Sequence, residues 1–389
     1  MKSPLQMSAD LIRKILVAVF LSACAFHGYA DSIAVPLRWR IGPSVSAGYV
    51  PPSNTFLDNA GIHSTLAGGV RAGFSLGDGA AVYQGIGLDV HTFFAGHDLG
   101  TPVSAFVYQG APIMRMGTRF WLGYEWRFGA AFGWHHYDRE TAPDNSAIGT
   151  PVTAMMSLGL KLHYSLTPRW QLSAGISGAH FSNGNTSHPN AGVNTICAEI
   201  GMSWLLNPES RPRVLPSVLV PGNSTASPWL CDIVAYGAWR KRVVRLDGEP
   251  YLCPGKFGVA GIQIAPMRRF GSMFATGISL DMQYDESAGL PPYWVSGTTG
   301  DDMKFYRPPF GRQLSIGLSA HAELTMPIFA INVGMGYDML SPRGNKRFYQ
   351  SLTLKTFVTR HLFINTGYRL GAFKDPQNLM LGVGVRLGD

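Results

Sequence analysis

Charged residues and long apolar runs are both scarce in this chain of 389 residues. Asp, Glu, Lys and Arg make up 14% of the sequence, whereas 46% is hydrophobic and 12% is aromatic. After residue 30, no apolar run reaches the ~18–20 residues that a membrane-spanning helix needs. A spanning helix is therefore excluded beyond the N-terminal region, and the apolar residues must belong to shorter elements.

Cysteine is also rare, and the few cysteines show no pattern of a ligand site. Of the four in the sequence, Cys197, Cys231 and Cys253 lack the CxxC or histidine spacing of a metal centre. Cys231 and Cys253 fall near opposite ends of a predicted hairpin, which disfavours a disulfide between them. No metal and no cofactor are expected.

The net charge of +8 is not accompanied by a nucleic-acid-binding motif, so nucleic acid is not an expected partner. A basic exported protein could favour anionic lipopolysaccharide by long-range attraction. A solvated loop surface without a specific partner explains the charge equally well.

The first 30 residues have the pattern of a secretory signal. Basic residues precede an apolar run over residues 15–26, which is too short to span a membrane, and Ala30 suits cleavage before Asp31. A competing interpretation is a lipoprotein cleavage box at residues 21–24, which would leave Cys24 as an acylated N-terminus. Either pattern predicts export.

The rest of the chain is dominated by period-2 alternation. Over residues 156–166 the even positions are apolar, while the odd positions are Ser157, Gly159, Lys161, His163 and Ser165. Residues 313–324 and 378–387 repeat this pattern. A continuous apolar face opposite a face of small and polar residues is typical of a transmembrane β-barrel.

Sixteen candidate strands can be placed, eight on each side of a segment rich in Pro and Arg at residues 207–228. We therefore predict an all-β, antiparallel outer-membrane β-barrel of about 14–16 strands. The alternative is an eight-stranded barrel over residues 31–206 followed by a second barrel, or half of one, over residues 229–389. Tight turns, as at 167–169, alternate with long loops, as at 184–192, and the long loops are expected to be extracellular.

One candidate site stands out, at residues 179–194. His180 and Ser182 are two residues apart on a predicted strand, so both side chains leave the same face. The even positions before and after them are apolar, which places His180, Ser182 and Asn194 at the rim of the lipid-facing surface. A histidine base beside a serine nucleophile can hydrolyse an ester, with Asn183 and the backbone around Gly184 supplying oxyanion donors.

The run from His180 to Asn183, followed by Pro189, Asn190, Ala191 and Gly192, resembles the signature of outer-membrane lipid A deacylases of the PagL type, the acyloxyacyl hydrolases. The resemblance covers about residues 36–205 and is sharp over residues 179–194. It implies that His180 is the base, Ser182 the nucleophile, and Asn190 and Gly192 parts of the supporting loop. It also implies a substrate, lipopolysaccharide in the outer leaflet of a Gram-negative outer membrane, from which an ester-linked hydroxyacyl chain is removed.

Asn194 departs from that family pattern. The family has a glutamate at this position, which orients the histidine, and Asn194 offers an amide oxygen without negative charge. Glu199 is expected on the opposite face of its strand, in the lumen, and cannot easily replace it. The alternative function is therefore a barrel without enzymatic activity, either a narrow pore or a structural or adhesion protein related to the deacylases.

Overall fold

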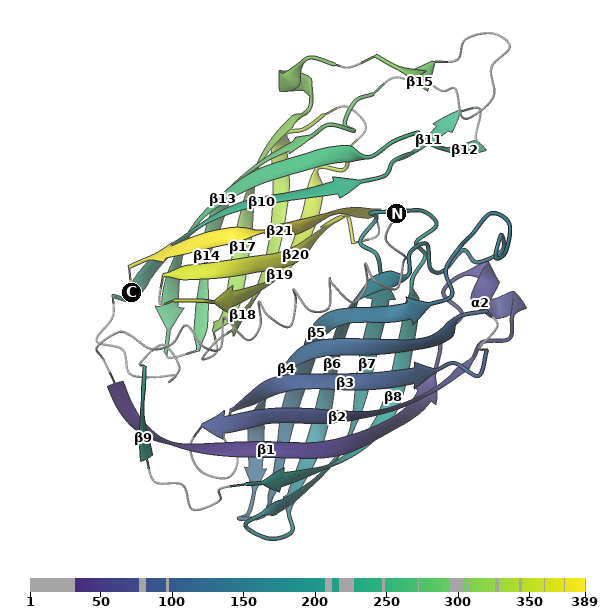
Figure 1. The fold of residues 1–389 in the computed structure, drawn as a ribbon. Helices are drawn as coiled ribbons and strands as arrows, with labels where there is room; N and C mark the ends of the chain where they lie inside the picture. Colours follow the sequence, from purple (N-terminus) through teal and green to yellow (C-terminus); the bar gives the residue numbers. More distant parts are fainter. Residues whose placement is uncertain are drawn as a thin grey trace, which may run out of the picture. The chain divides into compact units, whose positions relative to one another are not determined.

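The computed structural model describes residues 32–76, 82–95, 98–206, 212–216, 227–246, 249–271, 273–290, 292–293, 304–306, 308–325, 329–342, 345–359, 361–373 and 375–388. The predicted leader, including Cys24, lies outside these residues, as does most of the predicted connection at 207–228. The described chain separates into two compact units, and each contains one barrel (Figure 1).

The first barrel is built from eight antiparallel strands. They are β1 (Ser32–Tyr49), β2 (Ser64–Leu76), β3 (Tyr83–Thr92), β4 (Gly100–Met116), β5 (Phe120–Trp134), β6 (Val152–Ser165), β7 (Trp170–Ser182) and β8 (Val193–Leu205). A short helix, α2 (Thr55–Asn59), lies between β1 and β2, and the short strand β9 (Pro212–Pro216) also pairs with β1. The barrel closes because β1 pairs with β2 on one side and with β8 on the other.

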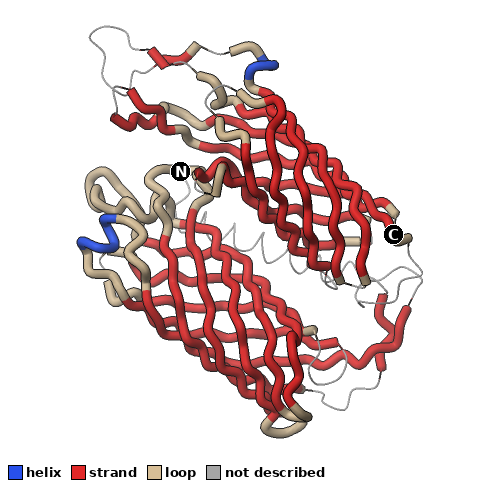
Figure 2. Tube along the Cα trace, turned by 180° about the vertical axis from the view of Figure 1, so that it is seen from behind, coloured by secondary structure: helices blue, strands red, loops and turns tan. Residues whose placement is uncertain are grey.

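The second barrel also has eight antiparallel strands (Figure 2). They are β10 (Trp229–Arg240), β13 (Phe257–Phe270), β14 (Phe274–Asp285), β17 (Leu314–Thr325), β18 (Phe329–Leu340), β19 (Phe348–Phe357), β20 (Leu362–Gly371) and β21 (Asp375–Leu387). Pairing of β21 with β10 closes it. The connections contain two small hairpins, β11 (Val243–Leu246) with β12 (Glu249–Leu252) and β15 (Pro292–Tyr293) with β16 (Lys304–Phe305), and the 3-10 turn η3 (Phe310–Arg312).

The all-β barrel prediction is confirmed in its alternative form, and the single barrel of 14–16 strands is wrong. The reason is that both edges of β1 are occupied within the first eight strands. Ala47, for example, is paired with Leu66 on β2 and with Ala198 on β8. Over residues 40–49, β1 is paired on both sides and leaves no edge to which a strand of the second half could add, so the strands from β10 onward close on themselves.

Burial follows the predicted alternation. On β8, Ile196 and Ile200 are 57% and 69% exposed on the outer face, whereas Glu199 is buried in the lumen. The outward apolar surface is continuous with that of neighbouring strands, as expected for strands that contact lipid. Among the described residues, no helix is both long enough and apolar enough to span a membrane.

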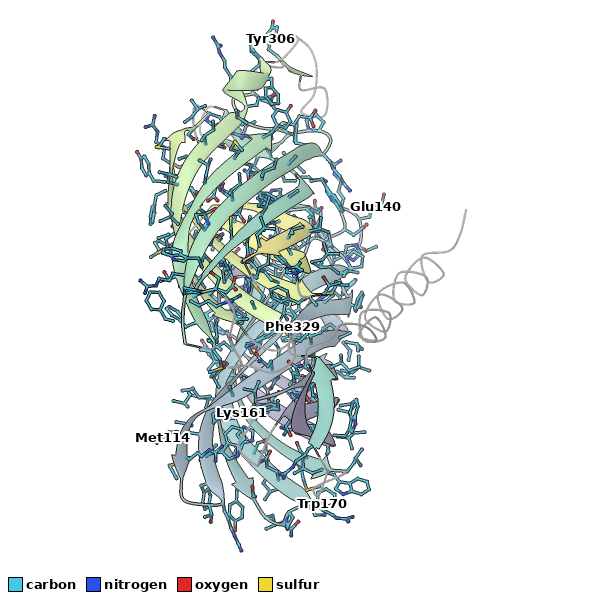
Figure 3. The ribbon with its side chains drawn as sticks, turned by 90° about the vertical axis from the view of Figure 1, so that its left-hand side faces the viewer. Met114, Glu140, Lys161, Trp170, Tyr306 and Phe329 are labelled. Atoms are coloured by element: carbon cyan, nitrogen blue, oxygen red, sulfur yellow. The ribbon has the colours of Figure 1, made fainter. Side chains whose placement is uncertain are left out.

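The lumen of each barrel is filled by paired charges. In the first, Lys161 (labelled in Figure 3) has its Nζ 2.7 Å from Glu125 Oε1 and 2.6 Å from Glu199 Oε1. Arg127 also pairs with Glu199. In the second, Lys355 and Arg386 pair with Asp232 and Glu323. Eight-stranded barrels are narrow enough for side chains to fill the interior. This packing disfavours the narrow pore that the sequence left open.

Candidate active site

His180 and Asn194 lie side by side at the end of the first barrel that carries the long loops. They are directly opposed residues of β7 and β8, and His180 Nδ1 lies 2.7 Å from Asn194 Oδ1. Because the amide oxygen is an acceptor, Nδ1 donates the hydrogen, and the neutral ring then carries its free lone pair on Nε2. Asn194 therefore orients the imidazole and fixes its tautomer without supplying negative charge.

Ser182 is the last residue of β7, two positions beyond His180 and on the same face. It is half-buried, and its neighbour across β6 is the small residue Ala154. Within the described part of the chain, no hydrogen bond joins Ser182 to His180. Catalytic hydrogen bonds are often long before substrate is bound, so this separation is compatible with a serine and histidine that act together.

Asn183 uses its donors to organise the loop after Ser182. Its backbone N–H donates to Asn190 Oδ1 at 2.9 Å, and its side-chain Nδ2 donates to the Ser187 carbonyl at 3.1 Å. The Asn183 carbonyl accepts from Thr186 Oγ1 at 2.9 Å. The sequence pattern offered Asn183 as an oxyanion donor, but its described bonds are those of a residue that shapes the loop.

Gly184 and Asn190 each offer a donor that has no partner among the described residues. Gly184, at φ +62°, follows Asn183 with a backbone N–H that no described residue accepts. Asn190 is held through its oxygen by Asn183, and its Nδ2 group likewise has no partner among the described residues. Gly184 and Asn190 are therefore two donors of this loop that a developing negative charge could use.

The backbone of Gly192 packs against the imidazole of His180. Its φ is +76°, and a Cβ built on it would lie 3.0 Å from His180 Cε1 and 2.9 Å from the Phe181 carbonyl. Its N–H donates to the Ala147 carbonyl at 2.9 Å, and its carbonyl accepts from Asn54 Nδ2 at 3.2 Å. The position requires glycine for both its backbone angle and its contact with the ring.

Glu199 is separated from this group by the barrel wall. It is 3% exposed, and its carboxylate pairs in the lumen with Lys161, Arg127 and Arg71. Among the described residues no carboxylate is hydrogen-bonded to His180. The orienting group on the outer face is the amide of Asn194.

Two residues that sequence reasoning missed tie the loops around the site together. Asn54 caps α2 by accepting from the Leu57 N–H at 3.0 Å, besides donating to Gly192. Asn145, 1% exposed, accepts from the N–H groups of Ala147 and Ile148 and donates to the carbonyl of His135 at 2.8 Å. For Asn54 a signal existed, because asparagine directly before a short helix is a preferred N-cap.

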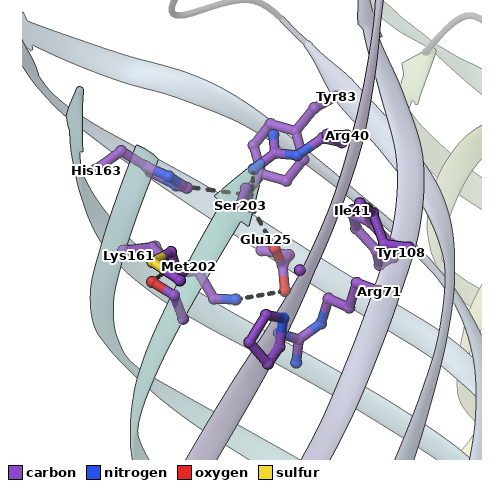
Figure 4. Close-up of a pocket in the computed structure, with 14 residues that line it drawn as sticks. Arg40, Ile41, Arg71, Tyr83, Tyr108, Glu125, Lys161, His163, Met202 and Ser203 are labelled. Atoms are coloured by element: carbon purple, nitrogen blue, oxygen red, sulfur yellow. Dashed lines mark hydrogen bonds and ion pairs between the residues drawn. The ribbon is translucent and has the colours of Figure 1, made fainter. Parts of the chain in front are cut away.

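Other polar groups in the first barrel do not form a competing site. A small pocket toward the short-turn end is lined by polar and apolar residues, and several of the polar side chains are bonded to one another (Figure 4). Tyr83 Oη donates to Glu125 Oε2 at 3.0 Å, and Arg40 Nη2 donates to Ser203 Oγ at 2.9 Å. Near the outer loops, donors from Thr141 and Glu140 hold the pKa of Asp138 below its usual range. No group of metal-binding side chains occurs among the described residues.

A closed antiparallel barrel with a continuous apolar outer face defines this chain as a membrane β-barrel protein. Two family models identify the family more closely. Residues 39–203 match lipid A 3-O-deacylase (PagL), and residues 229–389 match the C-terminal domain of acyloxyacyl hydrolase. The chain belongs to the PagL-type family of lipid A deacylases, which confirms the resemblance carried by residues 179–194.

The comparison with curated proteins gave no match. Among solved structures, the siderophore receptor PirA from Acinetobacter baumannii matches 87% of this chain and 68% of its own, at 7% identity and a TM-score of 0.23. The FrpB iron transporter from Neisseria meningitidis matches 83% of this chain and 56% of its own, at 12% identity and 0.19. CdiB from Acinetobacter baumannii matches 90% of this chain and 60% of its own, at 12% identity and a TM-score of 0.17. TM-scores this low carry no argument about function.

Proposed function

We propose that this protein is an outer-membrane lipid A deacylase that hydrolyses an ester-linked hydroxyacyl chain of lipopolysaccharide with Ser182 and His180. The observation that carries the proposal is the hydrogen bond of 2.7 Å between His180 Nδ1 and Asn194 Oδ1 on the outer face of the barrel. Ser182 lies two residues beyond His180 on the same strand. A nucleophile and base on a lipid-facing wall can act on an ester buried in lipid, where a lumenal site could not. Family membership supports the substrate class.

Each residue of the candidate site has one role in the proposed reaction. His180 Nε2 accepts the Ser182 hydroxyl proton as Ser182 Oγ attacks the ester carbonyl, and the Gly184 N–H and Asn190 Nδ2 donate to the oxyanion. The C–O bond to the sugar breaks, and the leaving alkoxide takes the proton from His180. Water, deprotonated by His180, then attacks the acyl-serine, releasing a hydroxy fatty acid and restoring Ser182. Asn194 holds the imidazole in the tautomer that both steps need.

The outward placement of the site supports a substrate in the membrane. Ser182 lies at the long-loop end of β7, which is the extracellular end in outer-membrane barrels. At the other end, Trp170 and Trp204 are stacked with their ring centroids 5.8 Å apart, and both are partly exposed. Tryptophans at a strand end suit a membrane–water interface. The ester would then lie in the outer leaflet.

In this proposal the protein is exported, and its chain has four parts. Residues 1–30 are the signal peptide, residues 31–206 the deacylase barrel, residues 207–228 the connection, and residues 229–389 the C-terminal barrel. The protein is located in the outer membrane of a Gram-negative bacterium, and lipopolysaccharide is its partner.

Mass spectrometry of lipid A from cells with and without the protein tests this function. We expect the loss of one hydroxyacyl mass with the parent protein, and no loss with Ser182→Ala. Ser177→Ala is the matched control, because Ser177 lies on the same strand with the phase of the opposite face. If folded parent protein removes no acyl chain, the hydrolase assignment fails, and the non-enzymatic barrel takes its place. The observation that favours the non-enzymatic barrel is that Asn194, next to His180, carries no negative charge.

A further inference from the structure

We infer that Asn54 and Asn145, from two loops outside the signature, are positioning residues that hold Gly192 against His180 and thereby fix the catalytic imidazole. The inference rests on the proposed function only in giving His180 the role of base. The contacts that carry it connect all four outer loops of the first barrel.

The first step is the contact between Gly192 and the ring. A Cβ on Gly192 would lie 3.0 Å from His180 Cε1 and 3.6 Å from Nε2, so the glycine backbone packs directly against the edge of the imidazole that carries the proposed base. Asn194 holds the ring through Nδ1 on another side. The imidazole is therefore held between an amide and a peptide backbone, and a shift of Gly192 would allow the ring to rotate away from Asn194.

The second step is that two other loops hold Gly192. Its carbonyl accepts from Asn54 Nδ2 at 3.2 Å, from the β1–β2 loop. Its N–H donates to the Ala147 carbonyl at 2.9 Å, and the Ala191 N–H donates to the Ser146 carbonyl at 3.2 Å, both in the β5–β6 loop. Thus both backbone polar groups of Gly192 are fixed from outside its own loop.

The third step is that Asn145 fixes the β5–β6 loop in turn. Its Oδ1 accepts from the Ala147 and Ile148 N–H groups at 3.2 and 3.0 Å, which shapes the segment that bonds Gly192. Its Nδ2 donates to the His135 carbonyl at 2.8 Å and to the Asp98 carbonyl at 3.4 Å, in the β3–β4 loop. Asn145 is 1% exposed, so its bonds are shielded from water.

The side-chain oxygen of each asparagine accepts from its own loop. Asn54 Nδ2 reaches the β7–β8 loop, whereas Asn145 Nδ2 donates both to His135 in its own loop and to Asp98 in the β3–β4 loop. Replacing asparagine with aspartate keeps the acceptor oxygen and removes the side-chain N–H donor. Asn54→Asp retains an acceptor for the Leu57 N–H, since aspartate caps helices as well as asparagine does. It replaces the donor to Gly192 with a carboxylate oxygen that repels the Gly192 carbonyl. Asn145→Asp likewise retains the acceptor for the Ala147 and Ile148 N–H groups, and it replaces the donor to the His135 and Asp98 carbonyls with a carboxylate oxygen that repels them.

The experiment compares the parent with Asn54→Asp, using Asn59→Asp as the control. Asn59 is exposed at the far end of α2 and outside this network. We expect Asn54→Asp to lower kcat on purified lipopolysaccharide roughly 10-fold with KM unchanged, because misplacing a catalytic group affects the chemical step. Asn145→Asp should act in the same direction, and Asn59→Asp should match the parent.

The tautomer of His180 provides a readout that does not depend on activity. The protein is labelled with 15N-histidine in detergent micelles, and the His180 signals are assigned by their loss in His180→Ala. We expect mainly the Nδ1–H form in the parent and in Asn59→Asp, and a mixed population in Asn54→Asp. Heat-modifiable migration on a gel checks that each barrel is folded, and Asn54→Ser, which keeps a capping oxygen, replaces Asn54→Asp if the latter does not fold.

The outcomes separate the two proposals. If Asn54→Asp is folded and changes neither kcat nor the His180 tautomer, positioning by Asn54 is wrong. If activity falls only in proportion to the folded fraction, Asn54 has a merely structural role and the inference is also wrong. If no variant releases acyl chains but the tautomer shifts in Asn54→Asp, the positioning network stands while the deacylase function fails.

Discussion

At the residue scale, Asn194 occupies the position where the resemblance to the family implies a glutamate. Its Oδ1 is 2.7 Å from His180 Nδ1, which in the proposed mechanism gives it the orienting part of a triad acid. It does not perform the electrostatic part, because an amide has no charge to stabilise the imidazolium that forms when Ser182 is deprotonated. The two parts of this role can therefore be separated experimentally in this protein.

We predict that Asn194→Glu raises turnover on purified lipopolysaccharide by ~10-fold or more, since it restores an anionic partner for His180. Asn194→Ala should lower turnover without abolishing it, because the nucleophile and oxyanion donors remain. Both are measured as released hydroxy fatty acid per folded molecule.

The contrary results are distinct from one another. A silent Asn194→Ala beside an inactive Ser182→Ala would mean that another group orients His180. An Asn194→Glu protein with unchanged turnover would mean that the charge of the third residue does not limit this enzyme.

The sequence was sufficient to predict where the strand residues of the candidate site lie, but not the contacts of its loops. Period-2 alternation predicts that His180, Ser182 and Asn194 share one face. In the structure His180 and Asn194 are opposed on β7 and β8, and Ser182 ends β7 two residues beyond His180. No comparable rule governs loops. The bonds of Asn183 within its own turn, and of Asn54 and Asn145 across loops, depend on tertiary contacts that no local pattern encodes.

At the element scale, strand β8 shows how one strand serves two surfaces. Asn194 faces outward beside His180, and Glu199, five residues on, faces the lumen among Lys161, Arg127 and Arg71. The site and the ion network share a strand without sharing a face. Stability and catalysis should therefore respond to different substitutions on β8.

We predict that Glu199→Gln lowers the free energy of unfolding by about 3 kcal/mol, because it leaves buried cations with too few anionic partners. Turnover per folded molecule should not change. Urea titration in detergent micelles, followed by tryptophan fluorescence, measures the first quantity, and lipid A deacylation measures the second. Glu323→Gln is the matched variant in the second barrel, where Glu323 pairs with Lys355 and Arg386. A loss of turnover in fully folded Glu199→Gln would show that the lumenal network influences the site after all.

At the scale of the whole molecule, the division into two barrels is decided by pairing that the sequence does not display. Both halves have eight strands of the same alternation, and alternation alone cannot tell whether Leu205 is followed by an edge or by closure. Pairs such as Ala47 with Ala198, far apart in the chain, decide it. The segment at residues 207–228 indicated where the chain could divide. The pairing of β1 with β8 closes the first barrel before this segment, so the chain does divide there.

Closure of the first barrel within its own strands leads to a prediction about truncation. Residues 1–206 contain all eight strands, the lumenal pairs of Glu125, Lys161 and Glu199, and the His180–Asn194 pair. We predict that this fragment folds in detergent, migrates as a heat-modifiable band and removes the acyl chain, with Ser182→Ala in the same fragment as the inactive control. Residues 1–192 should not fold, because without β8 both β1 and β7 keep an unpaired edge in an apolar environment, where each unsatisfied backbone group costs several kcal/mol. If residues 1–206 fail to fold while the full chain folds, closure of the first barrel requires the second, and hydrogen-bond pairing alone does not define the folding unit.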